Sequence, residues 1–213
     1  MWCIFVAAGL WLDEELKRIA ASGRTPRLLL HCCCAPCASY VLEYLSPFFD
    51  ITALFFNPNI EPFDEYEKRE SELCRLIAEV FYPNPVRVDS LGYDNSAFAS
   101  ATERLSDEPE GGRRCEVCFN VRLGETAKLA AARGFDYFAT TLSVSPHKNA
   151  ELLNEVGRGL EQSAGVRYLQ SDFKKRDGYK RSIELSKRFG LYRQSYCGCA
   201  PSQRAHGSAV RVV

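Results

Sequence analysis

Five segments with the length of strands alternate along this chain with segments of helical periodicity, most of which are ten or more residues long. The strand segments cover residues 27–32, 50–60, 85–90, 135–142 and 166–171, and the one at 85–90 is predicted from its alternation of apolar and polar residues. Because parallel strands need long crossovers, which are usually helical, this alternation predicts repeated βαβ units. We therefore predict an α/β fold: a doubly wound, mainly parallel sheet with helices on both faces, in a single domain.

The segments between the strands carry the expected helices and loops. Helices are predicted at residues 38–45, 62–81, 93–104, 116–134, 150–165 and 182–190. A basic loop at 172–182 leads into the last of them. The second strand ends in turn residues at 57–59.

The length of 213 residues suits one domain with a substantial core and is short for two. We expect an N-terminal helical extension at residues 1–26 that packs on the domain, an α/β domain at 27–200 and a loosely ordered tail at 201–213. The apolar run at 2–12 lacks a preceding basic stretch and is followed by acidic residues, which argues against a signal peptide. Since no segment reaches the ~20 apolar residues of a membrane span, we expect a cytoplasmic protein without a membrane partner.

The balanced charge and the absence of nucleotide-binding motifs argue against some functions. Lysine plus arginine and aspartate plus glutamate are equal at 27 each, so a polyanionic partner would have to be held by a local basic patch. The chain has neither a G-x-G-x-x-G sequence after a strand nor a Walker A sequence. A dinucleotide or P-loop site is therefore not indicated.

The chain contains ten cysteines, most of them in three short clusters: HCCCAPC at 31–37, CEVC at 115–118 and CGC at 197–199. Disulfide frameworks belong to small secreted chains that cannot build a core, whereas this chain is long enough to build one. Adjacent cysteines on an extended chain point to opposite faces and rarely bridge to each other. The clustering favours metal or redox chemistry over structural disulfides.

The pair Cys115 and Cys118 has two functional interpretations at a predicted helix N-terminus: a redox dithiol, or half of a metal site. A third, non-functional interpretation is that the two are structural thiols whose spacing arose by chance. The cysteines at 32–34 would complete a set of four thiolates, which suits zinc or an iron–sulfur cluster. Adjacent ligands at a strand end are unusual for zinc, so the residues favour an iron–sulfur cluster.

Near the end of the chain, Cys197 and Cys199 flank Gly198. A glycine between two cysteines lets the backbone bring the sulfurs together, as a reversible disulfide requires. The alternative is a pair of unrelated buried thiols.

Polar and basic side chains follow several predicted strands. The segment 173–181 interleaves aromatic and basic residues, which is typical of single-stranded nucleic-acid binding, although a solvated charged loop is the alternative. A loop histidine such as His147 is more often structural than catalytic. The candidates are Asn57, Asn59, Arg113, Arg114, His147, Lys148, Asn149, Lys174, Lys175, Arg176, Tyr179, Lys180 and Arg181.

The predicted topology brings these scattered segments together. In open α/β sheets the ligand site lies beyond the carboxyl ends of the strands. The first cysteine cluster, the turn at 57–59, the loop around 143–149 and the basic segment each follow a predicted strand. We therefore expect them on one rim of the sheet.

Together these motifs resemble the QueH-type epoxyqueuosine reductase family. HCCCAPC, FFNPNIEPFDEY, EPEGGRRCEVCF, TTLSVSPHKN, SDFKKRDGYKRS and LYRQSYCGC are similar to that family's segments in the same order, from Leu29 to Cys199. The resemblance implies a Rossmann-like or HUP-like fold, and an oxidoreductase that converts epoxyqueuosine to queuosine in the tRNA anticodon loop without cobalamin. It also implies an external low-potential electron donor as a partner.

The resemblance assigns roles to the cysteines. It implies a 4Fe-4S cluster on Cys33, Cys34, Cys115 and Cys118, a redox-active pair at Cys197 and Cys199, and a metal-proximal thiol at Cys37. An additional mononuclear iron at Cys37 and a proton donor at His147 are further candidates. Cys32 stands at the family's variable position, and residues 1–26 have no counterpart in the family. Residues 27–200 are then the catalytic domain with the iron–sulfur site.

Two functions of other classes remain as alternatives. A zinc-stabilised tRNA-binding protein without catalysis would use the four cysteines for structure alone. A cytosolic thiol-disulfide oxidoreductase would use Cys115 and Cys118 as its dithiol and would contain no iron.

Overall fold

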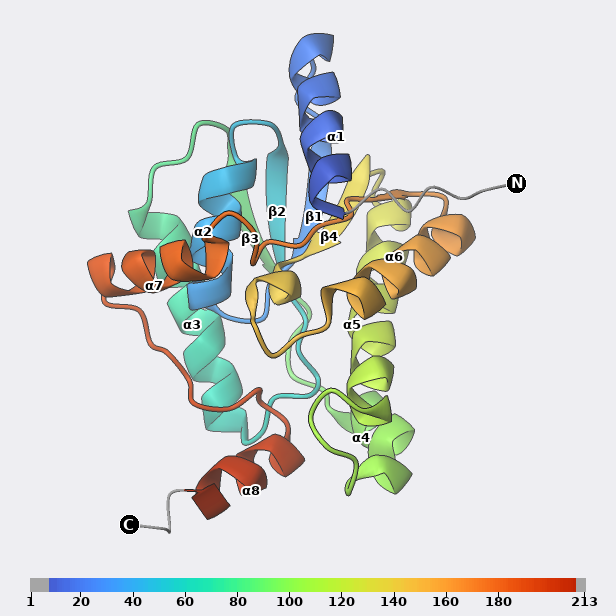
Figure 1. Cartoon of the computed structure of the whole chain (residues 1–213), viewed down its shortest axis with the longest axis vertical. Coiled ribbons are helices and arrows are strands. Elements are labelled where there is room, and N and C mark those ends of the chain that lie inside the picture. Colours follow the sequence, from blue (N-terminus) through green and yellow to red (C-terminus); the bar gives the residue numbers. More distant parts are fainter. Residues whose placement is uncertain (1–7, 210–213) are drawn as a thin grey trace.

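A parallel five-stranded sheet runs through the centre of the computed structural model, which describes residues 8–209 (Figure 1). Its strands are β1 (Arg27–His31), β2 (Asp50–Phe55), β3 (Val86–Ser90), β4 (Tyr137–Thr140) and β5 (Arg167–Tyr168). They lie in the order β3-β2-β1-β4-β5, and every neighbouring pair is parallel. The predicted doubly wound α/β fold is confirmed.

Helices connect the strands and cover the sheet. They are α1 (Ala8–Ser22), α2 (Ala35–Leu45), α3 (Phe63–Glu79), α4 (Ser96–Thr102), α5 (Arg113–Ala132), α6 (Ala150–Ala164), α7 (Gly178–Arg188) and α8 (Ala200–Ala209), with 3-10 helices η1 (Glu103–Leu105) and η2 (Thr141–Val144). Within the part of the chain that the structure describes, no helix is both long and apolar enough to cross a membrane.

Both faces of the sheet are buried. Along β1, Leu28 and Leu30 join the core formed with α1, α2 and α3, whereas Leu29 packs with α5 and α6 on the opposite face (Figure 1). This alternation follows from the period of two in a strand, and two covered faces explain why parallel strands read as continuous apolar runs.

The strand order reverses between β1 and β4. The chain passes from β1 to β2 and β3 on one side, and later returns to place β4 against the other edge of β1. His31 at the end of β1 pairs in register with Thr140 at the end of β4. Such a switch point leaves a crevice beyond the carboxyl ends of the two strands, where α/β proteins bind ligands.

The segment after β5 differs from the prediction. Because α7 begins at Gly178, Tyr179, Lys180 and Arg181 lie on a helix and not in the loop expected at 172–182. A Cβ atom at Gly178 would lie only 1.9 Å from the Phe173 carbonyl oxygen, so this tight entry into the helix requires glycine.

Three other boundaries differ. The strand expected at 166–171 is reduced to β5, because the backbone N–H of Ser171 donates to the Asn154 side chain. The helix expected at 93–104 is divided into α4 and η1. Helix α8 occupies part of the segment where a loosely ordered tail was expected. Residues 1–7 of the predicted extension and 210–213 of the predicted tail lie outside the described residues.

Helix α1 packs on the sheet through one apolar face. Leu12, Leu16 and Ile19 are each at most 5% exposed and belong to the same core as the side chains of β1. Their spacing of three and four residues is that of a single helix face. The N-terminal helix therefore contributes to the main core of the fold.

A buried carboxylate anchors α1 to the sheet. Glu15 accepts a hydrogen bond from the hydroxyl group of Tyr137, and one of its oxygens lies 2.7 Å from nitrogen atoms of both Arg18 and Arg167. Burial raises the pKa of Glu15, but the hydrogen bonds from Arg18 and Tyr137 outweigh it and lower the pKa to about 2.

We expect Glu15→Gln to lower the free energy of unfolding by about 1–3 kcal/mol at pH 7, because the neutral amide cannot compensate the two arginines. The contribution of the wild-type carboxylate is complete above its ordinary pKa of 4.5 and is lost as the pH falls toward 2. Urea unfolding at pH 7 and pH 3 should show a difference between wild type and variant that narrows in acid. Glu14→Gln, at an exposed position of the same helix, is the matched control. A difference that stays equally large at pH 3 would contradict this role.

Candidate active site

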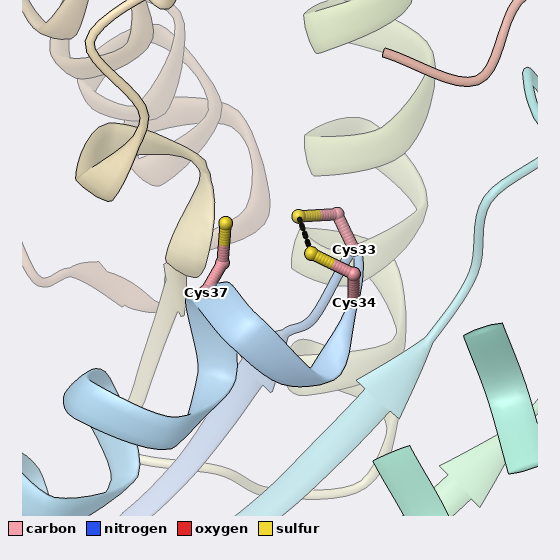
Figure 2. A group of neighbouring side chains, drawn as sticks. All are labelled: Cys33, Cys34 and Cys37. Carbon is pink, nitrogen blue, oxygen red and sulfur yellow. Dashed lines mark hydrogen bonds between the residues drawn. The ribbon is translucent and has the colours of Figure 1, made fainter. Parts of the chain in front are cut away.

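Three thiols gather where β1 ends and α2 begins. Figure 2 shows Cys33 and Cys34 on the connection and Cys37 on α2, with their sulfur atoms directed toward the same space. The Sγ atoms of Cys33 and Cys34 are 3.7 Å apart, and those of all three lie within 4.8 Å of one another. Pro36 lies in the first turn of α2 and favours an immediate helix start, which returns Cys37 to the other two. We call Cys33, Cys34 and Cys37 the thiol triad.

Cys32 is separate from the thiol triad. Its side chain is fully buried in the core on the α2 face, and its Sγ atom donates to the carbonyl oxygen of Leu30 at 3.4 Å. Cys33, the next residue, packs toward the opposite face, as successive residues of an extended chain do. Burial raises the pKa of the Cys32 thiol, which therefore stays protonated and structural.

Cys33 is the most acidic thiol of the triad. Hydrogen bonds from Cys34 and Cys37, together with the charge of Arg122, lower the pKa of Cys33 well below its usual range although burial opposes them. The same sharing raises the pKa of Cys34 to about 12 and also raises the pKa of Cys37 well above its usual range. The triad thus presents one thiolate, the form of cysteine that ligates soft metals.

A buried arginine of α5 lies close to the thiol triad. Arg122 is 2% exposed; its Nε atom donates to His31 Nε2 at 3.2 Å and its Nη2 atom to Asn57 Oδ1 at 2.6 Å. Its Nη1 atom lies 3.7 Å from Cys118 Sγ, and its charge also acts on Cys33. Burial and this positive charge lower the pKa of His31 to about 3, so the imidazole is neutral. Arg122 is a permanent positive charge beside two thiol groups.

The second predicted pair of cysteines lies in the first turns of α5, so the expected helix N-terminus is confirmed. Cys115 and Cys118 are 8% and 7% exposed, and the backbone N–H of Gly111 donates to Cys115 Sγ at 3.2 Å. Over residues 8–209, the triad is the one group of three or more potential ligand atoms found within 4.8 Å of one another. Cys115 and Cys118 therefore lie outside the thiol triad, and Arg122 of the same helix contacts Cys118 and acts through its charge on Cys33.

The Cys-Gly-Cys segment is held from α3 and from the connection after β2. Arg69 is 1% exposed and donates to the carbonyl oxygens of Cys197 at 3.0 Å and Tyr196 at 3.3 Å. Gly198 has φ +129°, and a Cβ atom there would lie 3.0 Å from Ile60. Only glycine tolerates both the positive φ angle and the close approach of Ile60, so this conformation of the segment requires a glycine between the two cysteines.

The two cysteines of this segment have different surroundings. Cys197 lines the cavity described below and is partly exposed, whereas Cys199 is 6% exposed and packs against Phe98 and Cys118. Burial raises the pKa of Cys199. The predicted redox pair is therefore asymmetric, with one sulfur at the cavity and one in the interior.

A cavity of about 250 Å³ opens beyond β1 and β4, at the predicted rim of the sheet. Of the residues predicted from sequence, it is lined by Cys33, Cys37, His147, Lys148, Tyr179 and Cys197. Charged and amide side chains that were not predicted also line it: Arg69, Glu110, Arg122, Arg193 and Gln194. The rim prediction is confirmed for the first cysteine cluster, the loop before α6 and the start of α7.

Several predicted substrate contacts have structural partners instead. Asn57 and Arg114 are buried with such partners, and Asn149 is the N-cap of α6, whereas Asn59 is buried with an Oδ1 atom that has no hydrogen-bond partner. Asn57 uses its amide to bind the Cys32 carbonyl oxygen and Arg122. Arg114 donates to backbone carbonyl oxygens of the loop before α5. Asn57 and Arg114 are thus buried and hydrogen-bonded within the protein, and their contact with a substrate stays a prediction.

Four of the predicted basic residues have an acidic partner: Lys148 with Glu110, Lys174 with Asp172, Arg176 with Asp13 of α1, and Arg181 with Glu43 of α2. Arg113, Lys175 and Lys180 are exposed at the surface, and the half-exposed Tyr179 lies beside the cavity. Part of the basic segment therefore holds α1 and α2 in place.

Of the cavity residues that were not predicted from sequence, three contact the cysteine segments: Arg122, Arg69 and Gln194, whose Nε2 atom lies 3.1 Å from Cys34 Sγ. One signal was present, since Arg122 follows Cys118 by four residues on a helix and such pairs share a face. For Arg69 and Gln194 the contacts join segments far apart in the chain, and no local pattern indicates them.

Comparison with known proteins decides the family. The family model "Epoxyqueuosine reductase QueH" matches residues 28–205. The chain belongs to the epoxyqueuosine reductase QueH family. A relative of that name from Streptococcus pyogenes serotype M1 is 44% identical over 202 residues, covering 94% of this chain and 76% of the relative. Another, from Staphylococcus epidermidis, is 40% identical and covers 88% and 82%.

A solved structure is similar in fold. The U34-tRNA thiolase NcsA from Methanococcus maripaludis with its 4Fe-4S cluster superimposes with a TM-score of 0.51 at 12% identity, covering 94% of this chain and 72% of that one. At this identity the likeness shows the shared Rossmann-like fold alone. The family comparison confirms the resemblance to QueH and assigns the chain to the oxidoreductases.

Proposed function

We propose that this chain reduces epoxyqueuosine to queuosine in the tRNA anticodon loop, without cobalamin and with a 4Fe-4S cluster. The observation that carries the proposal is the meeting of the cysteine clusters at one cavity: Cys33, Cys37 and Cys197 line it, and Arg122 of its wall contacts Cys118. Membership of the QueH family supports the reaction and the substrate.

The donor set fits the proposed cofactor. Cys33, Cys34, Cys115 and Cys118 are thiols at the starts of two helices, and Arg122 offers the positive charge that a group of thiolates needs in a buried site. When bound, the cluster supplies single electrons. Cys37, within 4.8 Å of Cys33 and Cys34, is the candidate for an additional mononuclear iron.

The residues of the chain supply protons and position the substrate. Conversion of an epoxide to an alkene consumes two electrons and two protons and releases water. His147, exposed at the cavity, is the proposed proton donor. Leu142 and Val144 form an apolar part of the wall that limits access of water.

The tRNA partner is proposed to meet the surface around the cavity. Tyr179 offers a ring for base stacking, and the exposed residues Arg113, Lys175 and Lys180 offer charges for phosphates. An external low-potential donor reduces the protein. In this proposal residues 27–200 form the catalytic domain, and the reaction takes place in the cytoplasm.

Anaerobic reconstitution tests the function. The protein is loaded with iron and sulfide, supplied with a low-potential reductant and tRNA that contains epoxyqueuosine, and the tRNA nucleosides are analysed by mass spectrometry. We expect conversion to queuosine; a loaded, reducible protein that leaves the nucleoside unchanged would refute the proposal. A brown protein with broad visible absorbance is expected. A colourless protein with one zinc would favour the tRNA-binding alternative, and iron-free activity on disulfides the thiol-disulfide oxidoreductase.

A further inference from the structure

A second cavity, of about 200 Å³, lies where α1, α2 and the segment after β5 meet. Its wall combines Leu10 and Leu12 of α1 and Tyr40 and Tyr44 of α2 with Phe173 and Lys175. The volume is below the ~300 Å³ at which pockets for drug-sized ligands begin, so the cavity suits a ligand group of one or two rings.

Two tyrosines form the aromatic part of this wall. Tyr40 and Tyr44 are four residues apart on α2 and therefore share a helix face. Their rings are stacked, with centroids 5.9 Å apart and an angle of 19° between the planes, and both side chains are half-buried. The Tyr44 ring also meets Phe173 edge-on at 6.3 Å, which fixes its orientation. The wall therefore presents a rigid aromatic surface, on which a nucleobase can stack.

The charges of the cavity favour an anion. Both acidic side chains of its wall are paired with basic ones. Asp13 pairs with Arg176, and Asp172 lies 3.1 Å from the Nζ atom of Lys174. Lys175 is exposed, and its ammonium group makes no ion pair within the part of the chain that the structure describes. One positive charge therefore remains for a phosphate group beside the aromatic surface.

The second cavity is next to the active-site cavity. Helix α2 passes both, since Pro36 and Cys37 line the first and Tyr40, one turn further on, lines the second. The start of α7 separates them. A Cβ atom at Gly178 would lie 2.5 Å from the Tyr40 ring, and the next residue, Tyr179, lines the active-site cavity. An RNA strand with one nucleoside in the active-site cavity therefore has to cross only this segment to reach the second cavity.

We propose that the second cavity binds the nucleotide next to the reactive nucleoside of the RNA substrate, with its base stacked on Tyr44 and its phosphate at Lys175. The proposal rests on the proposed function in taking an anticodon loop as the substrate. Aromatic rings beside basic side chains bind single-stranded nucleic acids in this way. Helix α1, which supplies part of the wall, precedes the residues that the family model matches.

A double-mutant cycle between protein and RNA tests this inference without turnover. The RNA is a fluorescent anticodon stem-loop carrying epoxyqueuosine, made with both neighbouring bases or with either one replaced by an abasic site. Its affinity for the reconstituted protein is measured by anisotropy in the absence of reductant. We expect one abasic site to weaken binding to the wild type about tenfold, Tyr44→Leu to weaken binding of the intact RNA equally, and the two changes together to add nothing further.

Matched variants separate stacking, charge and fold. Tyr44→Phe keeps the ring and should bind like the wild type. Lys175→Gln, a surface change that leaves the core intact, should lower the slope of log K against log salt by about 0.7. Lys128→Gln, 77% exposed on α5, is the control and should keep the wild-type slope.

Two results would overturn the proposal: additive effects of Tyr44→Leu and of both abasic sites, or a wild-type salt slope in Lys175→Gln. Conversion of the intact RNA by the wild type is measured separately and reports on the proposed function. A protein that converts epoxyqueuosine but shows no coupling in the cycle would therefore refute the nucleotide site alone, and coupling without conversion would refute the reaction alone.

Discussion

Alanine at Cys33 or Cys118 is expected to abolish the visible absorbance of the reconstituted protein, whereas alanine at Cys32 is expected to preserve it. Cys33 is the acidic thiol at the cavity, and Cys118 contacts Arg122, which lies one turn further along α5 and lines the cavity, so each is proposed to hold the cluster. Cys32 is fully buried in the opposite core with a protonated thiol. Iron and sulfide content, absorbance and conversion of epoxyqueuosine are the measurements. Activity should fall more than about 100-fold where a ligand is lost.

Two further variants make this series decisive. Cys74→Ala, at an exposed position of α3, is the control for the removal of a thiol that is not proposed to hold the cluster. Loss of the cluster in Cys32→Ala but not in Cys33→Ala would show that the ligand assignment is displaced by one residue. Loss in Cys37→Ala, with retention in Cys115→Ala and Cys118→Ala, would instead assign the metal to the thiol triad alone.

Replacement of Arg122 by methionine is expected to destabilise the protein by about 3–5 kcal/mol, because it leaves His31 Nε2 and Asn57 Oδ1 buried without their donor. It also removes the positive charge beside the thiols, so the reduction potential of the reconstituted centre should fall. Guanidinium chloride unfolding and an anaerobic redox titration measure the two effects.

The conservative variant tells the two effects apart. Arg122→Lys keeps the charge but cannot make three divergent hydrogen bonds, so it should restore the potential more fully than the stability. Arg87→Met, whose side chain is 60% exposed on β3, is the control. If Arg122→Met has the stability and potential of the wild type, Arg122 does not organise this site.

Local patterns predicted the secondary structure well. Each of the five strands was expected from an apolar run or, for β3, from alternation, and Gly165 with φ +72° ends α6 as predicted. Two of the errors lie where contacts between segments replace the expected local structure. Asn154 ends β5 early, and close packing of Gly178 on Phe173 lets α7 begin inside an expected loop.

The sequence by itself determined the element order, the rim that gathers the cysteine clusters and the family, because periodicity and motif spacing are local properties of the chain. Only the tertiary structure decided which charges are buried and what they contact. Lys148 contacts Glu110, 38 residues away in the sequence, and Arg122 contacts His31, 91 residues away. Contacts between such distant segments are determined by the packing of the fold alone. The structure likewise separated Cys32 from Cys33, since the face to which a thiol points depends on where the strand ends.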